Sequence, residues 1–173
     1  MENNKSVKSN NAGFSIIELI IVIAIMAVIG AAAFLTTAVA TDKHVNSCAQ
    51  KITSSLEQTR SITLGKQEGY VEIWQDTGDY VRCQMYIDGK KYGDEVAIGH
   101  PGLTVTVNMS DGTSPTLTSL GATHTKISFS RSNGGVIDAV NVESIVVSNG
   151  RRQITITIDK FSGRIEMGQV VVL

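Results

Sequence analysis

A single carboxylate stands inside the most apolar stretch of the chain. From Phe14 to Leu35 the sequence is almost wholly apolar, apart from Glu18 near its start. An unpaired charge in lipid costs about 3 kcal/mol or more, so Glu18 indicates a partner for its charge. Cleavage between Gly13 and Phe14 would supply one, because it would leave an α-amino group on Phe14, with Glu18 as the fifth residue of the shortened chain. Amine and carboxylate on neighbouring helices would then neutralise each other.

The other reactive residue types form no catalytic pattern. The sequence contains no HExxH, GxSxG, GxxxxGK[ST] or CxxC motif, the arrangements that assemble a metal site, a nucleophile or a phosphate cradle. The three histidines are scattered, which favours surface or loop positions: His44, His100 and His124. We therefore expect no enzyme, no catalytic residue, no metal and no cofactor.

A loose set of acids surrounds two expected turns: Asp76, Asp79, Asp88, Asp94 and Glu95. Their spacing lacks the dense ligand loop of a calcium site, so solvated turns are the favoured interpretation and calcium the alternative. Trp74 and Tyr70 lie on an expected strand and are interpreted as core or sheet-face residues.

Two cysteines, Cys48 and Cys83, permit one disulfide. Cys48 falls on an expected helix and Cys83 on an expected strand, and both would lie outside the membrane, where a bridge between helix and sheet is chemically allowed. Two buried thiols are the equally weighted alternative.

The apolar stretch has the length of a membrane helix. Together with Phe14 to Ile17, the uncharged run from Leu19 to Leu35 reaches about 20 residues, enough to cross a bilayer core. Lys5 and Lys8 precede it and favour a cytoplasmic N-terminus. A plain membrane anchor is one alternative. A signal peptide cut near Ala31-Ala32-Ala33 is another.

The residues Gly13-Phe14-Ser15-Ile16-Ile17-Glu18-Leu19, after a short basic leader, resemble the prepilin motif of type IV pilins and pseudopilins. The resemblance implies that a prepilin peptidase cuts after Gly13 and methylates the new amine of Phe14. It also implies that Phe14 and Glu18 serve filament assembly. The implied partners are other pilins or pseudopilins, the peptidase and methylase, the membrane and an inner-membrane assembly platform. The implied location is the inner membrane, followed by an extracellular or periplasmic filament.

Downstream of this run the pattern changes first to an amphipathic helix and then to strands. Apolar or small residues recur every three or four positions, as on one buried helix face: Val45, Cys48, Ile52, Leu56, Thr59 and Ile62. No proline interrupts Phe14 to Leu64, and Gly65 is a natural stop. Turn signals such as Asp88-Gly89 and Asn149-Gly150 then separate seven expected strands: 70–75, 80–87, 103–107, 126–129, 144–147, 153–158 and 164–167.

These elements predict an α+β protein, in which a long N-terminal helix packs on an antiparallel β-sheet domain in a pilin-like fold. The expected parts are a leader (1–13), a transmembrane and assembly helix (14–35), its amphipathic continuation (36–65) and a β-rich domain (66–173). Arg60 before the first strand and the turn Ser162-Gly163-Arg164-Ile165 resemble H-type minor pseudopilins of type II secretion and related minor type IV pilins. The family commonly has a proline in the membrane half of its helix, and this chain has none.

Some minor pilins of this kind bind DNA through a basic C-terminal turn, which makes Arg151, Arg152 and Arg164 candidate DNA contacts. Phosphate binding requires several clustered cations, and Glu166 stands where a second base would help. DNA binding is therefore the alternative, and a minor pilin or pseudopilin is the favoured interpretation. A membrane-anchored extracellular domain is a weaker alternative.

Overall fold

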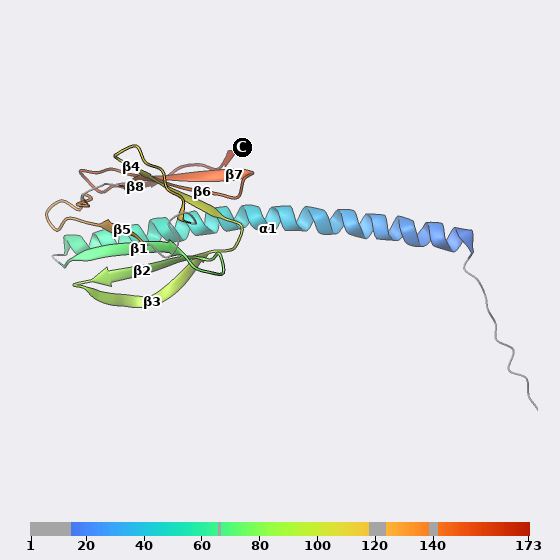
Figure 1. Cartoon of the computed structure of the whole chain (residues 1–173), viewed down its shortest axis with the longest axis horizontal. Coiled ribbons are helices and arrows are strands. Elements are labelled where there is room, and N and C mark those ends of the chain that lie inside the picture. Colours follow the sequence, from blue (N-terminus) through green and yellow to red (C-terminus); the bar gives the residue numbers. More distant parts are fainter. Residues whose placement is uncertain (1–14, 66, 118–123, 139–141) are drawn as a thin grey trace, which may run out of the picture. The chain divides into compact units, whose positions relative to one another are not determined.

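The computed structural model describes residues 15–65, 67–117, 124–138 and 142–173, and for residues 32–42 it describes the backbone alone. One helix, α1 (Ile16–Leu64), precedes a set of antiparallel strands. The chain divides into two compact units, residues 1–39 and residues 40–173. Helix α1 begins in the first unit and ends in the second. The α+β fold class, with a helix packed on antiparallel sheets, is confirmed (Figure 1).

Helix α1 ends where the sequence predicts. No proline occurs within it, and the amide of Gly65 donates to the carbonyl of Ile62 at 3.0 Å, which closes the last turn. On the amphipathic part, the predicted face is buried from Val45 to Thr59. Ile62 is only half-buried, and Thr63 takes the buried position instead, because a 3.6-residue turn places residue 63 above residue 59.

The first sheet has the strand order β3-β2-β1-β5. Its strands are β1 (Gly69–Gln75), β2 (Val81–Ile87), β3 (Lys90–Gly99) and β5 (Thr125–Ser128). Asp88 and Gly89 join β2 to β3 with φ angles of 49° and 73°, the positive values that a tight hairpin requires. Strand β3 was not predicted from the sequence, because its exposed, charged residues show no alternation.

The second sheet has the order β4-β6-β7-β8, with β9 also pairing with β7. Its strands are β4 (Thr104–Met109), β6 (Val142–Ser148), β7 (Arg152–Ile158), β8 (Ile165–Met167) and β9 (Val171–Val172). In β7 the three isoleucines are buried while Thr155 and Thr157 are not, which confirms the predicted alternation. The short β9 was not predicted.

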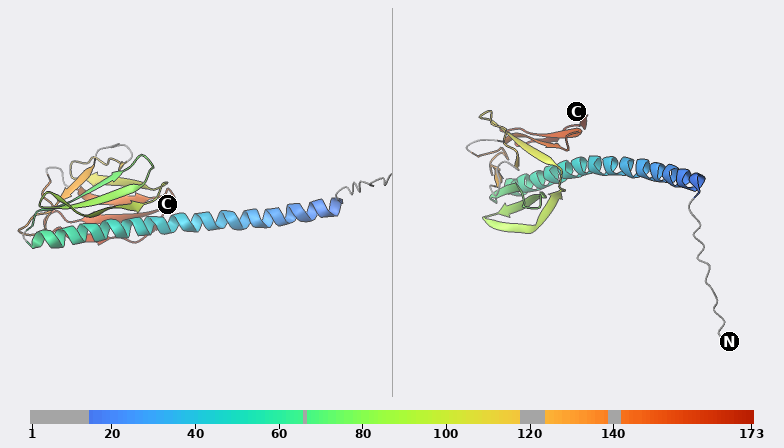
Figure 2. Two further views of the ribbon diagram at one scale, coloured as in Figure 1. Left: turned by 90° about the horizontal axis from the view of Figure 1, so that it is seen from below. Right: turned by 45° about the vertical axis from the view of Figure 1, so that its right-hand side comes forward.

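One hydrophobic core joins both sheets to the helix. Buried residues of α1, including Cys48, Ile52 and Leu56, belong to the same cluster as Ile73 and Ile127 of the first sheet. The cluster also contains Val105, Ile145 and Ile156 of the second sheet. Within the 40–173 unit, the end of α1 therefore lies alongside both sheets (Figures 1 and 2).

Candidate functional site

The predicted cleavage site lies partly outside the described residues. Nothing is described for Gly13 and Phe14, so their processing stays a prediction. Glu18 lies in the first turn of α1, and its amide donates to the carbonyl of Ser15 at 3.0 Å. A carboxylate at this end of a helix is stabilised by the helix dipole. The side chain of Glu18 is exposed, so its charge is open to an external partner.

Glu18 is followed by an uncovered apolar surface. The large apolar side chains between Ile16 and Ile29 are 46% to 80% exposed. A contiguous apolar surface of this kind marks an interaction site with protein or membrane. Among the described residues, no helical segment combines the length and the hydropathy that crossing a bilayer requires. The transmembrane role of residues 14–35 stays a prediction.

A second polar site joins the end of α1 to the turn between β7 and β8. Both Nε and Nη2 of Arg60 donate to the carbonyl oxygen of Ser162, at 3.1 and 2.8 Å. We call this contact the Arg60 clasp. Arg60 and Ser162 are 102 residues apart in the sequence. Each had been singled out in the sequence analysis, but their contact had not been predicted.

The turn held by the clasp is organised by Asp159. One carboxylate oxygen accepts from both the amide and the hydroxyl of Ser162, each at 2.7 Å. These hydrogen bonds, the amide bond first, hold the pKa of Asp159 below its usual value. The amide of Gly163 donates to the carbonyl of Asp159 at 2.7 Å. The turn is thus held by hydrogen bonds among its own residues as well as by those from Arg60.

The loop of residues 133–136 also contacts this turn between β7 and β8. The side-chain amide of Asn133 donates to the carbonyl of Phe161 at 2.9 Å. The backbone amide of Val136 donates to the carbonyl of Lys160, also at 2.9 Å. Gly163 has a φ of +64°, and a Cβ on it would lie 1.7 Å from the carbonyl oxygen of Gly134. Position 163 therefore requires glycine, both for its backbone conformation and for this close approach.

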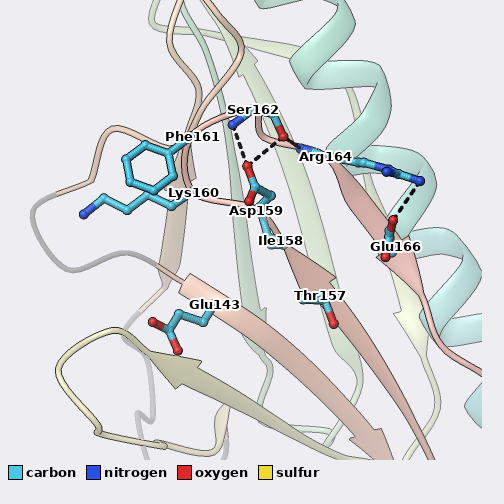
Figure 3. A pocket seen from close by; sticks show the side chains of 9 residues that line it. All are labelled: Glu143, Thr157, Ile158, Asp159, Lys160, Phe161, Ser162, Arg164 and Glu166. Carbon is cyan, nitrogen blue, oxygen red and sulfur yellow. Dashed lines mark hydrogen bonds and ion pairs between the residues drawn. The ribbon is translucent and has the colours of Figure 1, made fainter.

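An open hollow of about 580 Å³ lies beside this turn. Its lining includes Phe161, which is 77% exposed, with Lys160 and Glu143. Figure 3 shows Phe161 and Lys160 on one side of the turn and the Arg164–Glu166 pair on the other, the pair measuring 2.9 Å. The mixed charge and open form favour a contact surface over a catalytic pocket.

The structure does not bring the three candidate DNA contacts together. Arg151 and Arg152 lie at the start of β7, whereas Arg164 follows its end. A strand of this length separates them by roughly 20 Å at about 3.3 Å per residue. Arg164 also pairs with Glu166. This geometry does not support the cluster of phosphate-binding cations that DNA binding requires.

Both cysteines are free thiols in the structure, and both are buried. Desolvation by burial raises the pKa of Cys48 to about 12 and that of Cys83 to about 11. Of the two equally weighted alternatives, the structure contains the two buried thiols rather than the bridge. Thiols with such pKa values carry little thiolate at neutral pH and are poor nucleophiles.

The remaining polar candidates are used in local contacts on the protein surface. His44 and His100 lie against each other with ring centroids 4.1 Å apart, a proximity that the sequence did not reveal. His124 stacks on Trp74 at 4.3 Å and lies 3.0 Å from Glu72. Trp74 is half-buried, in agreement with a sheet-face position.

The acids around the two turns form local contacts, and two of them share Arg82. Asp76 pairs with Arg82 at 2.6 Å, and Arg82 also contacts Glu95 at 3.2 Å. That hydrogen bond to Arg82 is the main cause that lowers the pKa of Asp76. Asp88 accepts from the amide of Glu68 at 2.9 Å. Within the described ranges, no three histidine, cysteine or acidic residues converge on a metal position.

Comparison with known proteins bears on the N-terminal motif. A family model described as the prokaryotic N-terminal methylation motif matches residues 8–34. This match supports a type IV pilin-like or pseudopilin-like protein. The match contains Gly13, Phe14 and Glu18, the residues that carry the resemblance in the sequence. No curated protein and no solved structure matches the chain.

Proteins with the motif are structural subunits that associate with other pilins and with a prepilin peptidase, first at a membrane and then in a filament. The resemblance to H-type minor pseudopilins is not confirmed and stays a prediction.

Proposed function

We propose that the chain is a minor pilin or pseudopilin, a non-enzymatic subunit of a type IV pilus or of a type II secretion pseudopilus. The observation that carries the proposal is the methylation motif over residues 8–34. Cleavage between Gly13 and Phe14 removes the leader, and methylation follows on the amine of Phe14. The apolar start of α1 then anchors the subunit in the inner membrane, with the N-terminus cytoplasmic, until the assembly platform adds it to a filament.

The role proposed for Glu18 is to pair with the amine of Phe14 on a neighbouring subunit. The exposed carboxylate in the first turn of α1 supports this role, because the apolar surroundings of packed helices would make an unpaired charge costly. Each added subunit would thus neutralise one amine and one carboxylate. A helix placed in a wrong axial register would leave both unpaired.

The experiment that tests the proposal is mass spectrometry of the N-terminal peptide, from sheared surface filaments and from membranes of the native host. We expect an N-methylated peptide that begins at Phe14 in the sheared fraction. A chain that still begins at Met1 and is confined to membranes would contradict the proposal and favour a plain anchor.

The role of Glu18 is tested separately by substitution. We expect Glu18→Ala to leave membrane insertion intact and to reduce incorporation into sheared filaments at least about tenfold, since a mismatch of 1.4 kcal/mol already changes an equilibrium tenfold. Glu57→Ala is the matched control, an exposed glutamate on the same helix. Equal incorporation of Glu18→Ala and the control would contradict the charge-pairing role.

DNA uptake is not proposed, because Arg151 and Arg152 lie far along β7 from Arg164 and because Glu166 neutralises Arg164. Salt-sensitive DNA binding that is lost on replacing all three arginines would reverse this judgement.

A further inference from the structure

Helix α1 and the end of strand β3 meet at two histidines. His44 lies on α1 and His100 directly follows β3. Their ring centroids are 4.1 Å apart, and the ring planes are tilted by 42°. His44 is half-buried and His100 is exposed, so solutes can reach the pair from the surface.

The core fixes the backbone beside both histidines. Val45 follows His44 and Gly99 precedes His100, and both of these neighbours are buried. Gly99 also packs against the helix one turn beyond His44, since a Cβ on it would lie 3.0 Å from the sulfur of Cys48. The fold therefore holds the two imidazoles together from two separate elements, which is the condition for a preorganised site.

The ring nitrogens of this pair are not used by the protein. In the part of the chain that the structure describes, neither His44 nor His100 takes part in a hydrogen bond. His124 differs, because its Nδ1 lies 3.0 Å from a carboxylate oxygen of Glu72. A neutral imidazole has one nitrogen with a free lone pair, so the pair offers two nitrogen ligands at one place on the surface.

We propose that His44 and His100 bind one divalent transition-metal cation of the kind that prefers imidazole: Cu²⁺, Ni²⁺ or Zn²⁺. Metal–nitrogen bonds are about 2.0 to 2.1 Å long, so two rings on one ion have centroids roughly 4.5 to 5 Å apart. A shift of less than about 1 Å from the observed 4.1 Å, within reach of small side-chain rotations, completes the site. Water fills the remaining coordination positions.

The bound ion links α1 to the first sheet. Once one imidazole holds the ion, the second binds it intramolecularly, which raises the affinity above that of a single histidine. The unfolded chain does not hold the two rings together, so the ion stabilises the folded state. The inference departs from the expectation of no metal, because histidines scattered in the sequence meet only in the fold. It does not depend on the proposed function.

Cu²⁺ is the probe for the ligands, added to the full-length protein in detergent micelles. Electron paramagnetic resonance at one equivalent of Cu²⁺ is expected to show coupling to two imidazole nitrogens, and competition with glycine gives the affinity. We expect His44→Gln and His100→Gln each to weaken Cu²⁺ binding about tenfold or more, because each removes the chelation. His124→Gln is the matched control and should leave the affinity unchanged.

Urea unfolding, followed by the fluorescence of Trp74, provides a second measurement with Zn²⁺ as the probe. We expect Zn²⁺ to raise the midpoint of the unsubstituted chain and of His124→Gln, but not that of either site variant. Each protein is compared with itself, so a variant that is less stable without metal still gives a result. All variants keep both cysteines, so Zn²⁺ binding by thiols of the unfolded chain affects them equally.

Equal Cu²⁺ affinity of the unsubstituted chain and both site variants would overturn the inference. A loss caused by only one of the two substitutions would also overturn it, because it would show binding by a single histidine. The N-terminal mass of the same preparation reports on processing at Phe14, so failure of the proposed function would be seen separately.

Discussion

At the scale of single residues, burial controls the chemistry of the two cysteines. Cys48 lies on α1 and Cys83 on β2, and both belong to the core shared by helix and sheets. Close packing also reaches Gly99, where a Cβ would lie 3.0 Å from the sulfur of Cys48. Desolvation raises both thiol pKa values well above neutrality. These cysteines therefore act as small apolar residues in the folded protein.

We expect the two thiols to resist alkylation in the folded protein and to react fully after unfolding. The raised pKa values and the burial both lower the concentration of accessible thiolate at pH 8. Mass measurement after iodoacetamide treatment should show almost no adduct under native conditions and two adducts in denaturant without reductant. Two adducts that appear only after reduction would instead establish the bridge between Cys48 and Cys83.

At the scale of elements, the turn between β7 and β8 depends on a glycine. Gly163 combines a left-handed backbone conformation with close contact to the carbonyl of Gly134. Asp159, Ser162 and Asn133 then fix the polypeptide around it. A short turn thereby becomes a rigid support for the exposed side chain of Phe161.

We expect Gly163→Ala to destabilise the protein much more than Gly112→Ala. Both glycines have positive φ, +64° and +82°, but a Cβ at 163 would lie 1.7 Å from a backbone oxygen while one at 112 would meet nothing within 4 Å. Holding alanine in a left-handed backbone conformation costs about 1 kcal/mol in either variant. Gly163→Ala adds the clash of the new Cβ with the carbonyl oxygen of Gly134. Trp74, the only tryptophan, can report urea unfolding in detergent micelles. Similar midpoints for the two variants would show that the turn relaxes without cost.

At the scale of the whole 40–173 unit, the Arg60 clasp ties the helix to the second sheet. The same helical segment also contacts the first sheet, since a Cβ on Gly69 would lie 2.3 Å from the hydroxyl of Thr63. Arg60 thus joins the helix to the second sheet through one side chain and two hydrogen bonds. The hydrophobic core supplies most of the stability, and the clasp sets the position of the turn.

We expect Arg60→Ala to lower the free energy of unfolding by about 1 to 2 kcal/mol, the usual range for hydrogen bonds from a charged donor at a partly exposed site. Arg60→Lys should recover only part of the loss, because an ammonium lacks the paired geometry of Nε and Nη2. Gln58→Ala, at an exposed position on the same helix, is the control. An Arg60→Ala variant as stable as this control would show that the clasp does not contribute to stability.

The sequence by itself determined the features that depend on neighbours along the chain. Helix α1, its end at Gly65 and most strands follow from hydrophobic periodicity and turn residues, as the alternation in β7 illustrates. The N-terminal motif is also local, because a peptidase reads consecutive residues. This is why the resemblance to pilins could be stated from Gly13, Phe14 and Glu18 without knowledge of the fold.

Only the tertiary structure decided which distant residues meet. The contact of Arg60 with Ser162 crosses 102 residues, and no periodicity in the sequence encodes it. The length of β7 separates Arg152 from Arg164, although the resemblance to DNA-binding minor pilins made both of them candidates for one basic surface. Strands β3 and β9 were also not predicted, because β3 has no alternating pattern and β9 has two residues. Their pairing is fixed by the sheet that forms beside them, which is a feature of the tertiary structure.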